Sequence, residues 1–180
     1  PERYTERLMN AVQKELRLDR QPRHIECFDN SNLQGAHPVA SCVVFRDGKP
    51  SRKEYRHFNI KTVTGADDYA SMREVVFRRY TRLMAEGAEM PDLIIADGGK
   101  GQMGVIHEVL ERLGLDIPIA GLAKDDRHRT AELLCGFPPV LVGIRPTSPL
   151  FHFLAHIQEE VHRFAVSFHR QKRSKAFIHS

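Results

Sequence analysis

The chain has 180 residues, a formal net charge of +4 and 41% hydrophobic residues. This length suits one well-packed domain and is short for two. No apolar run approaches the roughly 18 residues that a transmembrane helix needs, and the start shows no signal-peptide pattern. The mildly basic charge is compatible with nucleic acid but does not demand it.

Two further features indicate the setting of the chain. It begins at Pro1 and not at a methionine, so we expect a piece of a longer protein. Its cysteines, Cys27, Cys42 and Cys135, form no Cys-x-x-Cys pair. This spacing argues against a zinc knuckle and a disulfide framework, and it indicates a reducing, cytoplasmic location.

The first third of the chain predicts one helix followed by three strands. Apolar residues at helical spacing in residues 3–18 predict a short amphipathic lead helix, which "QPR" ends. Residues 24–29 predict the first strand. Residues 37–60 predict two more strands joined by a turn at "RDGKP", where Asp-Gly is the hairpin signal.

The rest of the chain alternates helices and strands. Residues 66–84 predict a helix, for which "GADD" supplies an N-cap and first-turn acids. "DLIIAD" (92–97) is a short apolar strand, and "GGKGQ" turns the chain into a second helix. "IPIAGLA" (117–123) predicts a fifth strand, residues 130–143 a short hairpin or loop, and residues 148–171 a final helix.

This order of elements predicts an α/β fold with a five-stranded mixed sheet flanked by helices. Strand one pairs with strand two on one side. Strand four must return parallel through a right-handed crossover, and its natural place is the free side of strand one. The predicted strand order is therefore 3-2-1-4-5. The carboxyl ends of strands one and four then flank a topological switch point, where α/β sheets place their sites.

An aspartate ends each of these two central strands. Asp29 follows "IECF", and Asp97 follows "LIIA". Neighbouring strands lie about 4.8 Å apart, so the two carboxylates would repel each other unless a divalent cation bound both. Mg²⁺ and Mn²⁺ prefer such oxygen ligands. Either aspartate could instead form a turn or cap a helix, so the pattern alone leaves a metal site and two turn residues as alternatives.

The final helix supplies a histidine as the third candidate. His162 shares a flank of this helix with Glu159 and His169. His152 and His156 have the i, i+4 spacing of a zinc pair, but the segment lacks the glutamate of an HExxH motif and an obvious third ligand. A structural zinc protein built on that pair is therefore a minor alternative.

Seven segments, in order and with matching spacing, resemble the C-terminal endonuclease domain of the UvrC family. They are "RHIECFDNSNLQG", "VASCVVFRDGKP", "YRHFNI", "DDYASMREVVFRRY", "PDLIIADGGKGQ", "GLAK" and "EEVHRFAVSFHRQKR". The resemblance implies an RNase H-like domain at residues 23–175, after a lead helix and linker at 1–22 and before a tail at 176–180. It finds no counterpart here for the family's GIY-YIG nuclease, UvrB-binding and helix-hairpin-helix modules.

The resemblance also implies an activity and its residues. UvrC is the incision subunit of bacterial nucleotide excision repair, so a metal-dependent cut in damaged double-stranded DNA, 5′ of the lesion, is expected. UvrB, with UvrA upstream, would be a partner through regions outside this chain. By motif the catalytic and metal-binding set falls on Asp29, Asp97 and His162, with Mg²⁺ or Mn²⁺ as cofactor. Asp68 matches another acidic position of the family, although a first-turn acid that satisfies the helix dipole explains it equally well.

Two points stay open: a departure from the family's motif before the histidine, and the role of His162. The family commonly has "IRDE" before the histidine, whereas this chain has "IQEE", which puts Gln158 where arginine is frequent. His162 could bind metal or act as a general base. It must be neutral for either role, so activity is expected to fall as the pH drops through about 6.5.

Basic residues near the expected site predict contacts with DNA phosphates. They are Arg78, Arg79, Lys100, Lys124, His169, Arg170, Lys172 and Arg173. Lys100 lies in the Gly-rich turn, whose backbone N–H groups could also bind phosphate.

Two further alternatives for the function are a non-catalytic nucleic-acid-binding RNase H-like module and an endonuclease V-like nuclease. In the latter family the second acid lies in an Asp-Gly-His-Gly setting, unlike "DGGKGQ".

Overall fold

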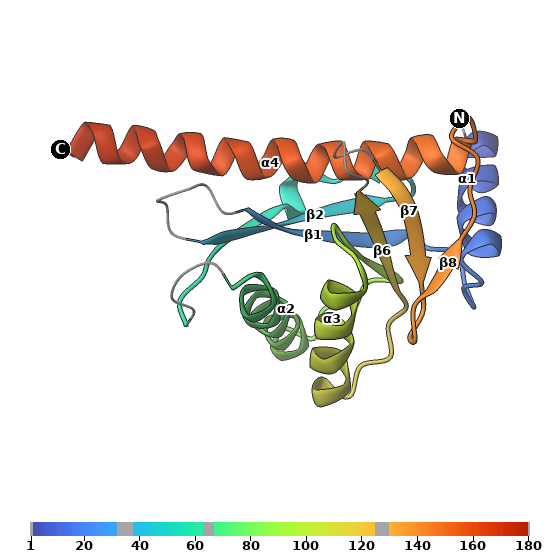
Figure 1. Ribbon diagram of the computed structural model, residues 1–180, viewed down its shortest axis with the longest axis horizontal. Coiled ribbons are helices and arrows are strands. Elements are labelled where there is room, and N and C mark those ends of the chain that lie inside the picture. The colour runs from blue at the N-terminus through green and yellow to red at the C-terminus, as the bar shows by residue number, and fades with distance from the viewer. Residues whose placement is uncertain (1, 32–37, 63–66, 125–129, 180) are drawn as a thin grey trace.

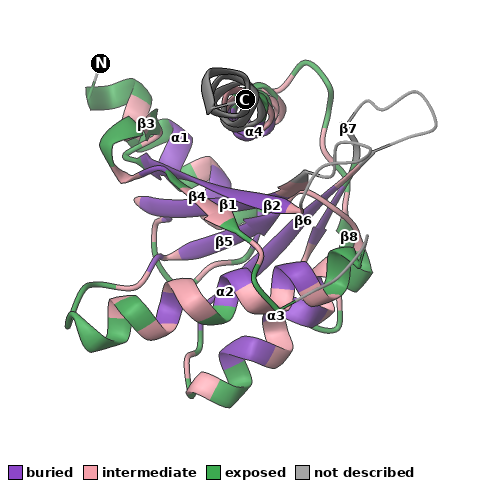
Figure 2. Ribbon diagram, turned by 90° about the vertical axis from the view of Figure 1, so that its left-hand side faces the viewer, coloured by how far each residue is buried: buried purple, intermediate pink, exposed green. Residues whose placement is uncertain are grey.

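The structure, a computed structural model, describes residues 2–31, 38–62, 67–124 and 130–179, with side chains to Ser167 except those of residues 31, 124, 130 and 131. A mixed sheet lies between two layers of helices (Figures 1 and 2). The helices are α1 (Glu2–Glu15), α2 (Asp68–Ala85), α3 (Lys100–Leu113) and α4 (Pro149–His179), with a 3-10 helix, η1 (Arg52–Glu54). The strands are β1 (His24–Ser31), β2 (Val39–Arg46), β3 (Lys49–Pro50), β4 (Arg56–Asn59), β5 (Leu93–Ala96), β6 (Ile119–Lys124), β7 (Thr130–Cys135) and β8 (Val140–Val142).

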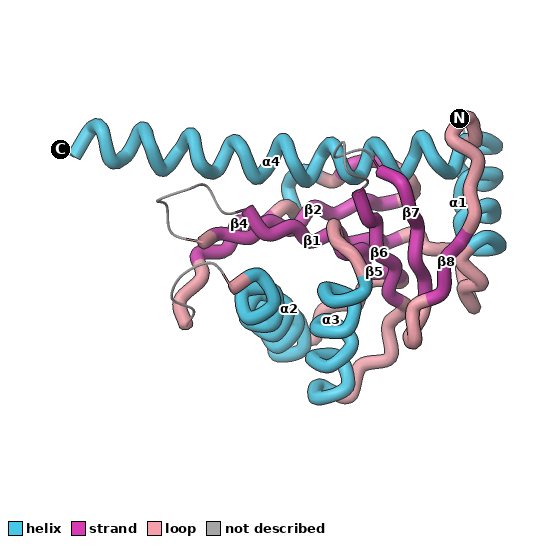
Figure 3. Tube along the Cα trace, viewed as in Figure 1, coloured by secondary structure: helices cyan, strands magenta, loops and turns pink. Residues whose placement is uncertain are grey.

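The described strands form one sheet in the order β3-β2-β1-β5-β6-β7-β8, with β4 also paired to β2 (Figure 3). β1 is antiparallel to β2 and parallel to β5, which is in turn parallel to β6. The predicted α/β class and the central order are therefore confirmed, since strands one, two, four and five are β1, β2, β5 and β6. The site expected between strands one and four thus lies at the β1–β5 junction.

The predicted number of five strands was too small, for two reasons. The expected third strand is divided into β3 and β4, because η1 interrupts the edge after Pro50. Pro50 is tolerated there because β3 is an edge strand, where a missing N–H breaks no ladder. Residues 130–143 do form a hairpin, but its strands β7 and β8 extend the sheet beyond β6.

The hairpin turn between β2 and β3 matches its sequence signal. Arg46 pairs with Lys49, which leaves a two-residue loop of Asp47 and Gly48. Both loop residues have positive φ angles, 52° and 81°. This is the backbone that two-residue hairpins prefer because its twist matches that of the strands, and it is why Asp-Gly predicts the turn.

The alternation of β1 decides which helices cover the site. Ile25 and Cys27 pack with α1 and α4 on one face, whereas Phe28 packs with α2 and α3 on the other. Successive side chains of a strand point to opposite faces. Asp29 therefore points to the face that α4 covers. The lead helix α1 belongs to the same layer, since its Leu8, Met9 and Val12 are buried in that core.

Each of the two helices on the other face begins at a recognisable signal. Asp67 caps α2, since its carboxylate oxygen accepts a hydrogen bond from the Ala70 N–H at 3.0 Å, which confirms the N-cap expected from "GADD". α3 begins at Lys100, directly after the turn of Gly98 and Gly99. Among the described residues, no helix combines the length and the apolar character needed to cross a membrane.

Gly121 in β6 allows the turn after Asp97 to lie close to the sheet. A Cβ atom at Gly121 would lie 2.6 Å from the Met103 sulfur and 3.0 Å from the Gly98 carbonyl oxygen. We expect Gly121→Ala to lower the free energy of unfolding by about 1–3 kcal/mol in urea denaturation, as overpacking does.

The matched control is Gly104→Ala, within α3. A Cβ atom there would meet nothing within 4 Å. Replacing a glycine inside a helix should stabilise the chain by about 0.5–1 kcal/mol, because alanine loses less backbone entropy on folding. Equal effects of the two substitutions would contradict the close approach at Gly121.

Candidate metal centre

Three separate elements bring Asp29, Asp97 and His162 together. Phe28 of β1 and Ala96 of β5 are direct partners in the parallel ladder, so the aspartate that follows each of them lies at the same end of the sheet. The Asp97 N–H donates a hydrogen bond to the Phe28 carbonyl at 2.9 Å, which joins the ends of β1 and β5. α4 crosses above and supplies His162. One potential ligand atom from each of the three residues lies within 4.8 Å of the others.

The imidazole of His162 lies between the two carboxylates. Its Nε2 is 3.0 Å from Asp97 Oδ2, and its Nδ1 is 3.5 Å from Asp29 Oδ2. The side chains of Asp97 and Asp29 are 3% and 10% exposed, whereas that of His162 is 43% exposed. The carboxylates are therefore sheltered beneath α4, and solvent reaches the centre from the side of His162.

The donor set fits a divalent cation. Two carboxylates in a sheltered position are ligands that Mg²⁺ and Mn²⁺ prefer, and one imidazole is compatible with Mn²⁺ in particular. Two like charges this close would otherwise oppose each other's ionisation. The three residues that the sequence predicts thus have the composition and the spacing of a small oxygen-rich metal centre.

Gln158 contacts the same centre, and sequence reasoning gave it no role. Its Nε2 donates to Asp97 Oδ1 at 2.8 Å. Gln158 is 7% exposed and lies one turn before His162 on α4. Asp97 therefore has a Gln158 amide at one oxygen and the His162 ring at the other. The place of Gln158 in the "IQEE" segment, where the family commonly has arginine, was the only signal in the sequence. That signal did not identify Asp97 as the partner of Gln158.

Asp68 lies beside the centre and is not part of it in the described residues. The group of three potential ligands consists of Asp29, Asp97 and His162. The backbone carbonyl of Asp68 accepts a hydrogen bond from the Asn30 side-chain amide at 2.7 Å. This bond joins the tip of β1 to the start of α2, so Asp68 marks the edge of the site.

Arg79 is not placed to contact DNA, and this corrects the sequence prediction. Its Nε and Nη2 donate to the two carboxylate oxygens of Glu26, both at 2.7 Å. Tyr80 and His24 also hydrogen-bond to that carboxylate, each at 2.8 Å. Burial raises the pKa of Glu26, but the hydrogen bonds from Arg79 and His24 outweigh burial and lower that pKa to about 2. Arg79 is therefore the buried counter-charge of a β1 glutamate.

Arg78 is also engaged within the fold. Its Nη1 donates to the Asn59 carbonyl at 2.7 Å and to Glu74 Oε2 at 3.0 Å. Its guanidinium carbon lies 5.5 Å from the centre of the Phe58 ring. These contacts join the end of β4 to α2, so Arg78 has a structural role on the side of α2 that faces β4.

The remaining predicted DNA contacts differ in what the structure describes. Lys100 is exposed at the first residue of α3, three residues after Asp97. The side chains of the other five lie outside the described part of the chain: Lys124, His169, Arg170, Lys172 and Arg173. Of the predicted set, Lys100 is thus the described cation beside the centre that is open to solvent.

The zinc alternative finds no support among the described residues. The His156 ring packs edge-on against Phe45, with ring centres 5.3 Å apart. Neither His156 nor His152 belongs to a group of three potential metal ligands there. His156 therefore contacts β2, and within the described part of the chain the i, i+4 pair of histidines forms no zinc cage.

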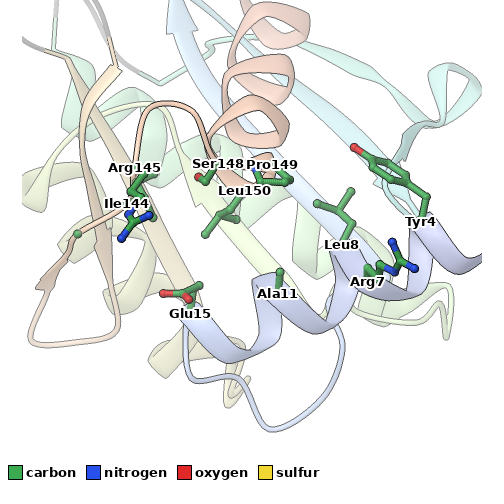
Figure 4. Close-up of a pocket in the computed structure, with 11 residues that line it drawn as sticks. Tyr4, Arg7, Leu8, Ala11, Glu15, Ile144, Arg145, Ser148, Pro149 and Leu150 are labelled. Carbon is green, nitrogen blue, oxygen red and sulfur yellow. The ribbon is translucent and has the colours of Figure 1, made fainter.

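A separate groove lies between α1 and the segment that leads into α4 (Figure 4). It has a volume of about 560 Å³, and Tyr4, Leu8, Ile144 and Leu150 are among the residues that line it. None of the three candidate ligands lines this groove. The candidate metal centre is therefore distinguished from this groove by its ligand chemistry and not by the size of a cavity.

The sequence of this chain is similar to a known domain family and to known proteins. A model of the UvrC RNase H endonuclease domain matches residues 13–166. UvrABC system protein C of Bacteroides fragilis is 63% identical over 180 residues, which are 100% of this chain and 30% of that protein. UvrABC system protein C of Streptococcus uberis is 63% identical over 161 residues, which are 89% of this chain and 27% of that protein. The chain thus spans less than a third of these relatives.

A solved structure is also similar. Ciona intestinalis endonuclease V, in complex with a 24mer DNA, aligns with 79% of this chain and 83% of its own chain, at 15% identity and a TM-score of 0.46. At this TM-score the likeness is weak. The family model, by contrast, matches the chain from α1 through β1 and β5 to His162 on α4. The chain therefore belongs to the UvrC family and carries its RNase H endonuclease domain.

Proposed function

We propose that this chain is the divalent-metal-dependent endonuclease that makes the 5′ incision at damaged DNA in nucleotide excision repair. The observation that carries the proposal is the meeting of Asp29, Asp97 and His162 within 4.8 Å at the β1–β5 junction. The relatives are named as components of a UvrABC system, which supports a role in an assembly of several proteins. The proposed endonuclease unit is residues 23–175, with residues 1–22 as lead helix and linker and 176–180 as tail.

Each residue of the centre has a proposed part. Asp29, at the end of β1, is the central ligand, and Asp97 and His162 complete the set. A bound Mg²⁺ or Mn²⁺ would lower the pKa of a water molecule and stabilise the charge on the leaving 3′-oxygen. Asp97 keeps one oxygen directed at His162, and His162 contributes a neutral nitrogen at the solvent-facing side, where a phosphodiester would enter.

The substrate and partners follow from the same assignment. We propose damaged double-stranded DNA as substrate, with Lys100 as a phosphate contact at the start of α3. UvrB, with UvrA upstream, would act through parts of the protein outside this chain. The proposed location is the cytoplasm, which fits the free thiols of Cys27, Cys42 and Cys135.

The test is incision of a duplex that carries one lesion and already has a nick 3′ of it. The chain is incubated with this duplex and Mn²⁺, and the products are mapped on a sequencing gel. We expect a cut in the lesion strand on the 5′ side, which EDTA abolishes. Binding of the duplex with no cut at any Mn²⁺ concentration would instead favour a non-catalytic nucleic-acid-binding module.

A further inference from the structure

We propose that Gln158 is a positioning residue that fixes the orientation of the Asp97 carboxylate for metal binding. This inference rests on the proposed function, because it assigns Gln158 a part in the same centre. The observation is a part-buried contact, in which Gln158 Nε2 lies 2.8 Å from Asp97 Oδ1. The other carboxylate oxygen, Oδ2, lies 3.0 Å from His162 Nε2.

The chemistry of the pair decides which end of the amide faces Asp97. An ionised carboxylate only accepts hydrogen bonds, whereas an amide group offers both a donor and an acceptor. The NH₂ group of Gln158 must therefore face Asp97, since two acceptors would repel. This donor occupies Oδ1 and leaves Oδ2 as the oxygen presented to the metal centre.

Asp97 needs such a partner because its terminal side-chain torsion does not by itself fix the orientation of the carboxylate. The terminal torsion of an aspartate is broad, so an unheld carboxylate samples many orientations. A donor at one oxygen selects one of them. Partners of this kind orient metal ligands in many proteins, and their loss typically costs about 10–100-fold in metal affinity or activity.

α4 delivers both contacts from one face. Gln158 and His162 are four residues apart, which places them one above the other on a helix. Ile157 and Val161, each 0% exposed, pack the adjacent face of α4 into the core. A shift of α4 along its axis would therefore break both contacts to Asp97. Residues from two successive turns of α4 contact the two oxygens of this carboxylate.

The neutral charge of Gln158 has a further consequence. With both carboxylates ionised, Asp29 and Asp97 present two negative charges to a divalent cation. A lysine or arginine at position 158 would supply a hydrogen bond and also a positive charge that repels the metal ion. A carboxamide orients Asp97 without that repulsion, so this chain combines fixed geometry with the full charge of its carboxylates.

The experiment compares Mn²⁺ binding to the 180-residue chain and to Gln158→Met, which keeps the side-chain length and removes the donor. Isothermal titration gives the Kd for Mn²⁺, and the Mn²⁺ dependence of incision gives a second value. We expect Gln158→Met to raise both by about 10–100-fold, with incision recovering at saturating Mn²⁺. A merely structural role would lower activity equally at every Mn²⁺ concentration.

Glu159→Met is the matched control, because Glu159 is the next residue of α4 and is exposed. It should bind Mn²⁺ as wild type does. Gln158→Asn is a second variant, whose amide is one methylene too short to keep the bond; it decides the matter if Gln158→Met does not fold. Wild-type affinity in the folded Gln158 variants would overturn the inference while the proposed function stands. A wild-type chain that neither binds Mn²⁺ nor cuts DNA would overturn the proposed function itself.

Discussion

Asp29→Asn is expected to lower Mn²⁺-dependent incision by more than about 100-fold, since loss of a direct ligand should cost more than loss of an outer partner. The same substitution should not destabilise the chain when metal is removed. Asp29 and Asp97 are both mostly buried and their centre brings oxygens within 4.8 Å, so loss of one charge relieves repulsion. Activity and stability should thus change independently at this position.

Two assays on the same preparation check this expectation. Incision of the nicked, lesion-bearing duplex measures activity, and thermal unfolding in EDTA measures stability. Asp116→Asn is the matched control, because Asp116 is an exposed aspartate between α3 and β6 and should keep wild-type incision. An Asp29→Asn variant that cuts DNA at the wild-type rate would rule out Asp29 as a ligand.

Arg79→Met is expected to lower the free energy of unfolding by about 3–5 kcal/mol, because it leaves the Glu26 carboxylate buried without its counter-charge. The side chains of Arg79 and Glu26 are 10% and 1% exposed, so water cannot replace the lost partner. Urea denaturation followed by circular dichroism measures the effect. Glu26→Gln combined with Arg79→Met should recover part of the loss, since no buried charge then remains unpaired.

Arg82→Met is the matched control on the same helix. Arg82 pairs with Glu86, but its side chain is 80% exposed, and exposed pairs of this kind contribute about 0–1 kcal/mol. An Arg79→Met variant no less stable than Arg82→Met would contradict the buried ion pair and return Arg79 to the candidates for DNA contact.

The same pair predicts an acid dependence of stability. The pKa of Glu26 is lowered to about 2 in the folded chain, whereas a glutamate in an unfolded chain has a pKa of about 4.3. The stabilisation is therefore complete above the unfolded value and is lost as the pH falls toward about 2. Wild type should lose stability more steeply over this range than the Glu26→Gln, Arg79→Met double variant.

The centre of the fold could be predicted because its signals are local or topological. Asp-Gly marks the β2–β3 turn, and Asp67 marks the start of α2. The right-handed crossover rule leaves the free side of β1 as the place for β5, which brings Asp29 and Asp97 to one end of the sheet. The edges were harder, since the short β7 and β8 have no strong apolar period.

The contacts that sequence reasoning missed are long-range pairings of polar groups. Glu26 is separated from Arg79 by 53 residues, and Gln158 from Asp97 by 61. No local pattern specifies such a partner. A glutamate inside "IECF" did carry a signal, since a buried acid in a core strand requires a counter-charge. That signal could have indicated that one basic residue lies in the interior, but it could not have selected Arg79 among the arginines of α2.

The measurement that tests the central claim most directly is the position of Mn²⁺ in crystals of this chain grown with MnCl₂, located by anomalous scattering. We predict a peak enclosed by the Asp29 and Asp97 carboxylates and the His162 ring, absent from crystals of Asp29→Asn. Crystals in which Mn²⁺ lies elsewhere, or in which no peak lies among these three side chains, would contradict the claim that they form a metal centre.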